Sequence, residues 1–208
     1  MNVLARKTKA LVLGSRIPKR YIVTSGFGQT DEGSGADPHE TGSFDEALVA
    51  AGLGKVNLVK YSSVLPPEAE EVPLEVAAEH FHHGAVMDAI VASVSGGSGD
   101  VLVAALGRMN VYDHESRHIG GFAVEFMNCR HGGTRPAVEA EAEDAIKRAM
   151  EGVFQRRYRG KGYRYERMPP TIISGFVEKK YGTAIAVIGW VSYIHPVLGE
   201  TAVEPAEE

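Results

Sequence analysis

The sequence predicts an α+β fold, a layered αββα-type sandwich of mainly antiparallel strands with two main helices. Short segments rich in β-branched residues recur along the chain and are separated by clusters of turn residues. Only two segments repeat apolar residues at helical spacing, and such interrupted runs of strands are typical of layered α+β folds. The 208-residue length and the 44% hydrophobic content suit a single globular domain spanning residues 1–208.

The first predicted elements are a short strand, a loop and a short helix. Residues 21–25 (YIVTS) are β-branched and predict a strand, whereas the glycine-rich, acidic residues 26–42 predict a mobile loop. Ser43 is a plausible N-cap for a helix, because apolar residues then recur at helical spacing at Phe44, Ala47, Leu48 and Ala51. Gly52 supplies a stop signal for this helix.

Several strands are expected in the middle of the chain. Residues 56–65 (VNLVKYSSVL) are strand-like, and Pro66 and Pro67 end the strand because proline lacks the N–H that a ladder needs. The Ser-Ser pair at positions 62 and 63 therefore lies near the end of a predicted strand. Further β-rich segments, which favour an antiparallel sheet, are residues 85–95, 101–106 and 119–127.

The last third of the chain contains the longer predicted helix and two more strands. Thr134 can cap this helix, and Pro136 lies early in it, where proline is tolerated. Its expected apolar positions are Ala137, Ala145, Ile146, Ala149 and Phe154. Residues 171–177 and 183–192 predict two strands, and the polar residues 200–208 predict a frayed tail.

Composition and motifs exclude several classes of function. The formal net charge of -5 disfavours nucleic acid as a partner. Gly26 and Gly28 lack the third glycine of a dinucleotide-binding loop, and no Walker loop is present. The single Cys129 rules out an intrachain disulfide and a multi-cysteine zinc site. The histidines at positions 80, 82 and 83 lack the spacing of paired metal ligands, so no metal is expected.

The apolar runs of the chain are short. Residues 10–13 follow basic residues near the N-terminus but are too few for the apolar part of a signal peptide. Residues 183–194 fall below the roughly 20 residues that span a bilayer. We therefore expect no membrane partner and, because a lone cysteine suits a reducing compartment, a cytoplasmic protein.

The pair Ser62 and Ser63 gains its meaning from its neighbourhood. A Ser-Ser dipeptide alone is more often structural, with its hydroxyls bonded to nearby backbone groups. Residues 51–70 (AGLGKVNLVKYSSVLPPEAE), however, closely resemble the processing segment of pyruvoyl-dependent arginine decarboxylases. The resemblance covers most of the chain and continues in residues 43–48 (SFDEAL), 72–74 (VPL), 122–126 (FAVEF) and 177–182 (VEKKYG).

This resemblance implies that the chain makes its own cofactor. The Ser63 hydroxyl would attack the Ser62 carbonyl and form an ester, and elimination at Ser63 would then release a chain that ends at Ser62. The products would be residues 1–62 and residues 63–208, the second beginning with a pyruvoyl group derived from Ser63. Such a ketone can form a Schiff base with a substrate amine and accept electrons as the carboxylate leaves.

The resemblance also implies roles for four other residues. Glu125 would donate a proton to the substrate, because an apolar strand favours an uncharged carboxyl; the alternative is an ion pair with a buried arginine. Asn57 would support the developing oxyanion, or serve only as a turn residue. Asp45 would grip the guanidinium of a substrate arginine, or only stabilise a helix end. Val64 would line the substrate site.

The expected small-molecule partner is arginine, which the family converts to agmatine and carbon dioxide. The resemblance implies a homotrimer of processed subunits, or a higher multiple, with active sites between neighbours. Residues 29–40 form a longer loop than is usual in the family, and residues 41–43 are less bulky than expected beside the substrate. Two alternatives stay open: the same chemistry on another amino acid, such as aspartate, and an uncleaved, non-catalytic homologue that acts as a binding or regulatory subunit.

Overall fold

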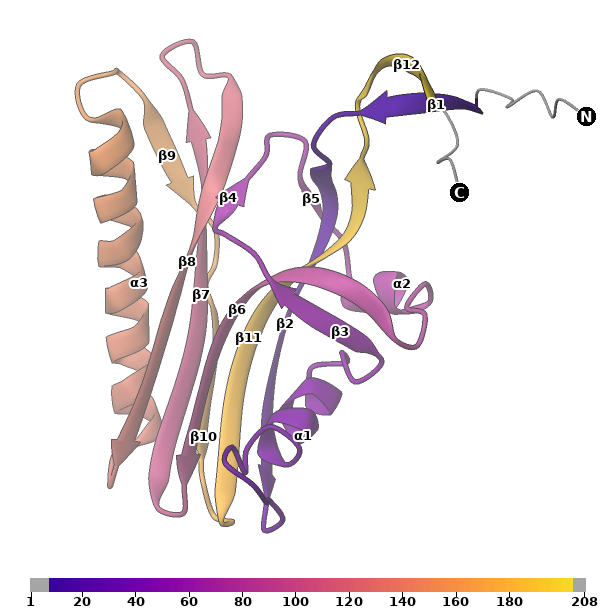
Figure 1. Ribbon diagram of the computed structural model, residues 1–208. Helices are drawn as coiled ribbons and strands as arrows, with labels where there is room; N and C mark the ends of the chain where they lie inside the picture. Colours follow the sequence, from indigo (N-terminus) through magenta and orange to yellow (C-terminus); the bar gives the residue numbers. More distant parts are fainter. Residues whose placement is uncertain (1–7, 204–208) are drawn as a thin grey trace, which may run out of the picture.

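The computed structural model describes residues 8–203, which form two five-stranded sheets facing each other and a separate two-stranded ribbon (Figure 1). The β2 sheet contains, in spatial order, β3 (Val56–Lys60), β6 (Ala85–Gly97), β11 (Tyr181–Ile194), β2 (Ile17–Thr30) and β5 (Glu70–Glu71). The β8 sheet contains β10 (Thr171–Phe176), β7 (Asp100–Tyr112), β8 (His118–His131) and β4 (Val64–Leu65), with β9 (Arg164–Arg167) also paired to β7. The ribbon consists of β1 (Thr8–Leu13) and β12 (Val197–Val203).

Helices cover the outer faces of both sheets. α3 (Arg135–Tyr158) lies against the β8 sheet, whereas α1 (Ser43–Ala50) and the short α2 (Leu74–Ala78) lie against the β2 sheet (Figure 1). The strand pairs are antiparallel except for β2 with β5 and β3 with β6. The layers therefore run helix, sheet, sheet, helix, which confirms the predicted α+β sandwich. α2 is an addition to the two helices expected from the sequence.

Apolar side chains fill the spaces between these layers. The core between the two sheets includes Ile90, Leu106, Ile188 and Trp190. α3 packs on the β8 sheet through a stripe at every fourth residue, formed by Val138, Ala142, Ile146, Met150 and Phe154. Helical spacing predicted Ile146 and Phe154 correctly, but Ala137 is exposed and Ala145 and Ala149 are only half-buried. Alanine is small enough to lie beside such a stripe as well as in it.

β2 is longer than the sequence predicts, because the strand continues through two glycines. Gly26 and Gly28 lie within β2, so the prediction of a mobile loop over residues 26–42 is wrong for its first part. A Cβ added at Gly26 would lie 2.1 Å from the Ala47 carbonyl oxygen, and one at Gly28 would lie 2.3 Å from the Ala47 nitrogen. Both glycines therefore allow α1 to pack closely on the strand, rather than turning the chain.

The ends of α1 differ in part from expectation. Gly42 occupies the N-cap position and Ser43 is already the first helical residue, so the predicted Ser43 cap is wrong. The buried Ser43 hydroxyl lies 2.8 Å from the Thr183 hydroxyl of β11 and ties the helix to the sheet. Gly52 follows the helix with a φ of +74°, which confirms the predicted stop.

The β1–β12 ribbon projects from the sandwich (Figure 1). Leu11 pairs with Glu200 in this ribbon, so the prediction of a frayed tail is wrong for residues 200–203, while residues 204–208 lie outside the described residues. Of the basic residues that precede the apolar run at 10–13, those at positions 6 and 7 also lie outside the described residues. No helix within residues 8–203 is both long and apolar enough to cross a membrane.

Candidate active site

The predicted strand at residues 56–65 is two strands that belong to different sheets. β3 pairs in parallel with β6 as far as Lys60 and Ala89, within the β2 sheet. β4 pairs with β8 through Val64 and Phe122, within the β8 sheet. The prediction of one continuous strand is therefore wrong, because residues 61–63 carry the chain across from one sheet to the other. The Ser-Ser pair lies in this crossing.

Each end of the crossing is anchored to a different sheet. The Tyr61 N–H donates a hydrogen bond of 2.7 Å to the Ala89 carbonyl of β6. The Ala123 N–H of β8 donates a hydrogen bond of 2.9 Å to the Ser63 carbonyl. Ser62 is exposed and Ser63 is half-buried. The peptide bond between Ser62 and Ser63, here called the scissile bond, is thus held from both sides without being part of either sheet's ladder.

The scissile bond borders a cleft of ≈ 520 Å³ at one edge of the β8 sheet. Four of the predicted site residues line this cleft: Ser62, Ser63, Val64 and Glu125. The remaining walls come from β8 and α3 and consist of Phe122, Ala123, Val124, Ala149, Val153 and Arg157. The structure therefore brings together the two serines and the candidate proton donor, although they are more than 60 positions apart in the sequence.

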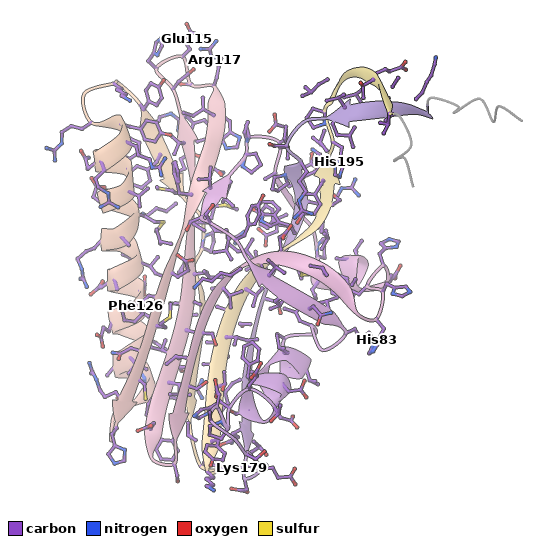
Figure 2. The ribbon with its side chains drawn as sticks, viewed as in Figure 1. His83, Glu115, Arg117, Phe126, Lys179 and His195 are labelled. Atoms are coloured by element: carbon purple, nitrogen blue, oxygen red, sulfur yellow. The ribbon has the colours of Figure 1, made fainter. Side chains whose placement is uncertain are left out.

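The position of Glu125 follows from the geometry of β8. β4 covers the edge of β8 only at Gly121 and Phe122, so within residues 8–203 the edge beyond them has no neighbouring strand. Phe126, the next residue, packs with α3 (Figure 2). Because successive strand residues point to opposite faces, Glu125 points away from that helix, toward the side of the β2 sheet. Glu125 is half-buried and lines the same cleft as Ser63.

The alternative reading of Glu125, an ion pair with a buried arginine, finds no support in the structure. No ion pair formed within residues 8–203 includes Glu125. The buried Arg108 instead pairs with Glu71 of β5 and donates a hydrogen bond of 3.3 Å to the Tyr21 hydroxyl. This contact ties the two sheets together.

Arg157 is a cleft residue that the sequence did not reveal. α3 ends at Tyr158, and basic residues such as Arg156 and Arg157 are typical of the last turn of a helix. The Arg157 guanidinium lies over the Phe122 ring, 4.5 Å from its centroid, and so borders the cleft. Ala149, Val153 and Arg157 are spaced by four residues, and this spacing is the signal that could have placed all three on one face of the helix.

Asn57 and Asp45 do not line this cleft within one chain. Asn57 lies on β3, where its side-chain amide donates a hydrogen bond of 3.0 Å to the Gly84 carbonyl. Asp45 is exposed in the first turn of α1. α1 covers the outer face of the β2 sheet, whereas Ser63 is bonded to the β8 sheet (Figure 1). Asp45, the expected ligand of the substrate guanidinium, and the scissile bond are therefore on different sides of the β2 sheet.

The histidines near α2 are surface residues. His80, His82 and His83 are all exposed, and Figure 2 shows His83 at the periphery of the molecule. Within residues 8–203, no three His, Cys, Asp or Glu side chains are grouped in a way that could hold a metal ion. A second hollow of ≈ 300 Å³ lies in this region and contains none of the predicted site residues.

Comparison with known proteins identifies the family of this chain. The model of the pyruvoyl-dependent arginine decarboxylase family matches residues 20–195, which include nearly all of both sheets, the two serines and Glu125. The pyruvoyl-dependent arginine decarboxylase AaxB of Chlamydia caviae is 27% identical over 186 residues, covering 86% of this chain and 94% of the relative. The pyruvoyl-dependent arginine decarboxylase of Methanopyrus kandleri is 41% identical over 80 residues, covering 38% of this chain and 46% of the relative. This chain belongs to the pyruvoyl-dependent arginine decarboxylase family.

Proposed function

We propose that this chain is a single self-processing domain, cut into residues 1–62 and 63–208, that decarboxylates arginine to agmatine. The observation that carries the proposal is the shared cleft of the scissile bond and Glu125. The relatives named above are arginine decarboxylases by name, which supports arginine as the substrate. The free, exposed Cys129 suits the reducing cytoplasm that we propose as its compartment.

Self-cleavage begins with the Ser63 hydroxyl. Its oxygen attacks the Ser62 carbonyl carbon, the peptide C–N bond breaks, and an ester with a free Ser63 amine results. Removal of the Ser63 α-proton then expels the Ser62 carboxylate and leaves a dehydroalanine. Its imine form takes up water and releases ammonia, so that residue 63 ends as a pyruvoyl group. No external oxidant or cofactor is needed for this sequence.

The position of Ser63 fits a pyruvoyl group. The Ser63 carbonyl is bonded to the Ala123 N–H of β8, so the new chain end stays fixed in the cleft when Ser62 is released. Its half-buried setting leaves one side open to a substrate. A ketone here would condense with the substrate amine and accept the electrons released as carbon dioxide leaves. Ser63 thus provides both the reactive group and its attachment.

We assign the remaining roles by position in the cleft. Glu125 gives a proton to the substrate α-carbon after carbon dioxide has left, since it is the carboxyl that lines the cleft. Val64, which is 50% exposed beside Ser63, contacts the substrate chain. Asn57 supports the oxyanion formed during cleavage, a role that requires its amide to exchange the hydrogen bond to Gly84.

Asp45 is assigned to the substrate guanidinium in an assembly of several chains. Within one chain it lies across the β2 sheet from the cleft, so a neighbouring copy must supply it. The open edge of β8 beside Glu125 leaves room for such a neighbour. We propose a homotrimer of processed subunits, or a higher multiple, in which each cleft is completed by the next copy.

The direct test of this function compares the wild-type protein with Ser63→Ala. The wild-type chain should be cut and should release agmatine and carbon dioxide from arginine. Ser63→Ala should remain one uncut chain without activity, because no hydroxyl is present to attack the Ser62 carbonyl. Cleavage of Ser63→Ala would point to a contaminating protease instead of self-processing.

A substrate screen tests the role of Asp45. A fully cleaved sample is offered arginine and aspartate in parallel, and carbon dioxide release is measured for each. We expect turnover of arginine alone, because a carboxylate pairs with a guanidinium through two charge-assisted hydrogen bonds and repels a second carboxylate. Turnover of aspartate alone would contradict the assignment, and turnover of neither by a cut chain would favour a regulatory subunit.

A further inference from the structure

A buried carboxylate lies next to the crossing that contains the scissile bond. Asp88 of β6 has a side chain only 6% exposed, on the face that also directs Ile90 and Ala92 into the core between the sheets. The Tyr193 hydroxyl of β11 donates a hydrogen bond of 2.5 Å to Asp88 Oδ2. The Arg16 guanidinium lies 2.5 Å from the same oxygen. Asp88 is therefore held by a hydroxyl and a cation that come from two other segments.

Arg16 and Tyr193 also contact each other. The Arg16 guanidinium lies over the Tyr193 ring, 4.6 Å from its centroid. Burial and the hydrogen bond to Asp88 raise the pKa of Tyr193 above its ordinary value, so its hydroxyl stays protonated and keeps donating. We call these three residues, Arg16, Asp88 and Tyr193, the Asp88 cluster.

The Asp88 cluster adjoins the last anchored residue before Ser62. Ala89, which follows Asp88, accepts the hydrogen bond from the Tyr61 N–H through its carbonyl. The Tyr61 side chain packs against the same inter-sheet core as Tyr193. Its phenol is also among the groups that raise the pKa of Tyr193. A displacement of Asp88 would therefore also displace Tyr61, the residue before Ser62.

Self-cleavage requires the Ser63 oxygen to approach the Ser62 carbonyl carbon closely. Ser63 is fixed to the β8 sheet by Ala123, whereas the Ser62 side of the bond is fixed to the β2 sheet through Tyr61. The alignment of the two reacting atoms thus depends on where β6 holds Tyr61 relative to the β8 sheet. Misplacement of reacting groups by about 1 Å can slow a reaction by roughly 100-fold.

We propose that the Asp88 cluster positions the Ser62 side of the scissile bond for self-cleavage. These are positioning residues, because they act through Tyr61 and line no part of the cleft. The inference rests on the self-processing proposed above and deepens it. It also gives a role to Arg16, which precedes β2 and lies outside the residues 20–195 matched by the family model.

The test measures the rate of cleavage and the activity of the cut protein separately. Full-length chains are made by cell-free synthesis, sampled over time and analysed by intact mass. Asp88→Asn should cleave at least ~10-fold more slowly than the wild type. Tyr193→Phe, which removes a single hydroxyl, should also slow cleavage. It provides a second test of the cluster if Asp88→Asn does not fold. Arg16→Lys should cleave faster than Arg16→Gln, because it keeps the charge.

Asp113→Asn is the matched control. The Asp113 side chain is 4% exposed and pairs with Arg117 at 2.8 Å, but it lies at the tip of the β7–β8 hairpin, where Figure 2 labels Arg117, far from the crossing. It should cleave at the wild-type rate. Once cut, Asp88→Asn should decarboxylate arginine within about twofold of the wild type per cleaved chain, because Ser63 stays anchored to the other sheet.

Three results would overturn this inference while leaving self-processing intact. The first is a wild-type rate of cleavage in both Asp88→Asn and Tyr193→Phe. The second is equal slowing in Asp113→Asn, which would indicate a general loss of stability. The third is a parallel fall in cleavage and in activity per cleaved chain. A wild-type chain that does not cleave would instead refute the proposed function itself.

Discussion

Ser62 and Ser63 are adjacent in sequence but are held by different sheets. The backbone before Ser62 is bonded to β6, and the Ser63 carbonyl is bonded to β8. If the proposed cleavage breaks the bond between them, each new chain end would therefore keep its own attachment. Residue 63 would stay in the cleft that Glu125 also lines, whereas the Ser62 end would stay attached to β6 through Tyr61. With this division, the proposed cleavage could occur without releasing either chain end from its sheet.

Glu125→Gln separates cleavage from decarboxylation. The amide has nearly the same shape as the carboxyl but cannot act as a general acid, so the chain should still be cut while arginine turnover falls by roughly 100- to 10,000-fold. The measurement is the rate of agmatine formation per cleaved chain. Glu178→Gln, an exposed glutamate in the β10–β11 turn, is the control and should keep full activity. Full activity of Glu125→Gln would remove Glu125 from the mechanism.

At the scale of elements, glycines decide how closely α1 approaches β2. The side chains of a strand normally separate it from a helix, but Gly26 and Gly28 leave a groove that the Ala47 backbone occupies. Ser43 and Thr183 add a buried hydrogen bond at the start of the helix. The exposed Asp45 is thereby fixed on the surface of the β2 sheet, where a neighbouring chain can reach it.

Gly26→Ala should loosen this contact. The added Cβ would lie 2.1 Å from a backbone oxygen of α1, which cannot rotate away, so the free energy of unfolding should fall by about 1–3 kcal/mol. Denaturant-induced unfolding of uncut Ser63→Ala chains provides the measurement. Gly97→Ala, whose Cβ would meet its nearest atom at 3.7 Å, should be neutral or slightly stabilising. Equal stability of the two variants would show that α1 can move away from β2 at little cost in free energy.

The elements themselves were largely predictable from local patterns, because alternation and helical spacing report which face of a segment is buried. The predictions of secondary structure fail where contacts with residues far away in the sequence determine the local conformation. Gly26 and Gly28 are typical turn residues, and only the packing of α1 explains them in a strand. Residues 56–65 are uniformly strand-like, so nothing local reveals that their halves join different sheets. Arg157 lines the cleft because α3 packs on the β8 sheet, which the sequence alone does not show.

At the scale of the whole molecule, the candidate site is divided. The scissile bond, Glu125 and Arg157 share one cleft, but Asp45 lies beyond the β2 sheet. The resemblance could indicate Asp45 as a ligand of the substrate, yet sequence alone could not show that one chain keeps it apart from Ser63. The proposed assembly of several chains would resolve this separation, because the surface of one copy would face the open β8 edge of the next.

Mixed assemblies test this division of the site. Asp45→Asn and Glu125→Gln are produced separately and then together in the same cells, so that subunits mix as they fold. Each variant alone should have little activity. Together they should recover about a quarter of the wild-type activity, since random mixing in a symmetric assembly gives that share of sites both native residues. A mixture no more active than its components would mean that both residues act within one chain.

The intact mass of freshly purified wild-type protein shows whether the chain cleaves itself between Ser62 and Ser63. Self-processing predicts two chains, residues 1–62 and residues 63–208, with the second beginning in a ketone that has no free amine. It also predicts that arginine decarboxylation rises in proportion to the cut fraction. A preparation that turns over arginine while its chain is continuous from residue 1 to residue 208, or while residue 63 is still serine, would contradict it.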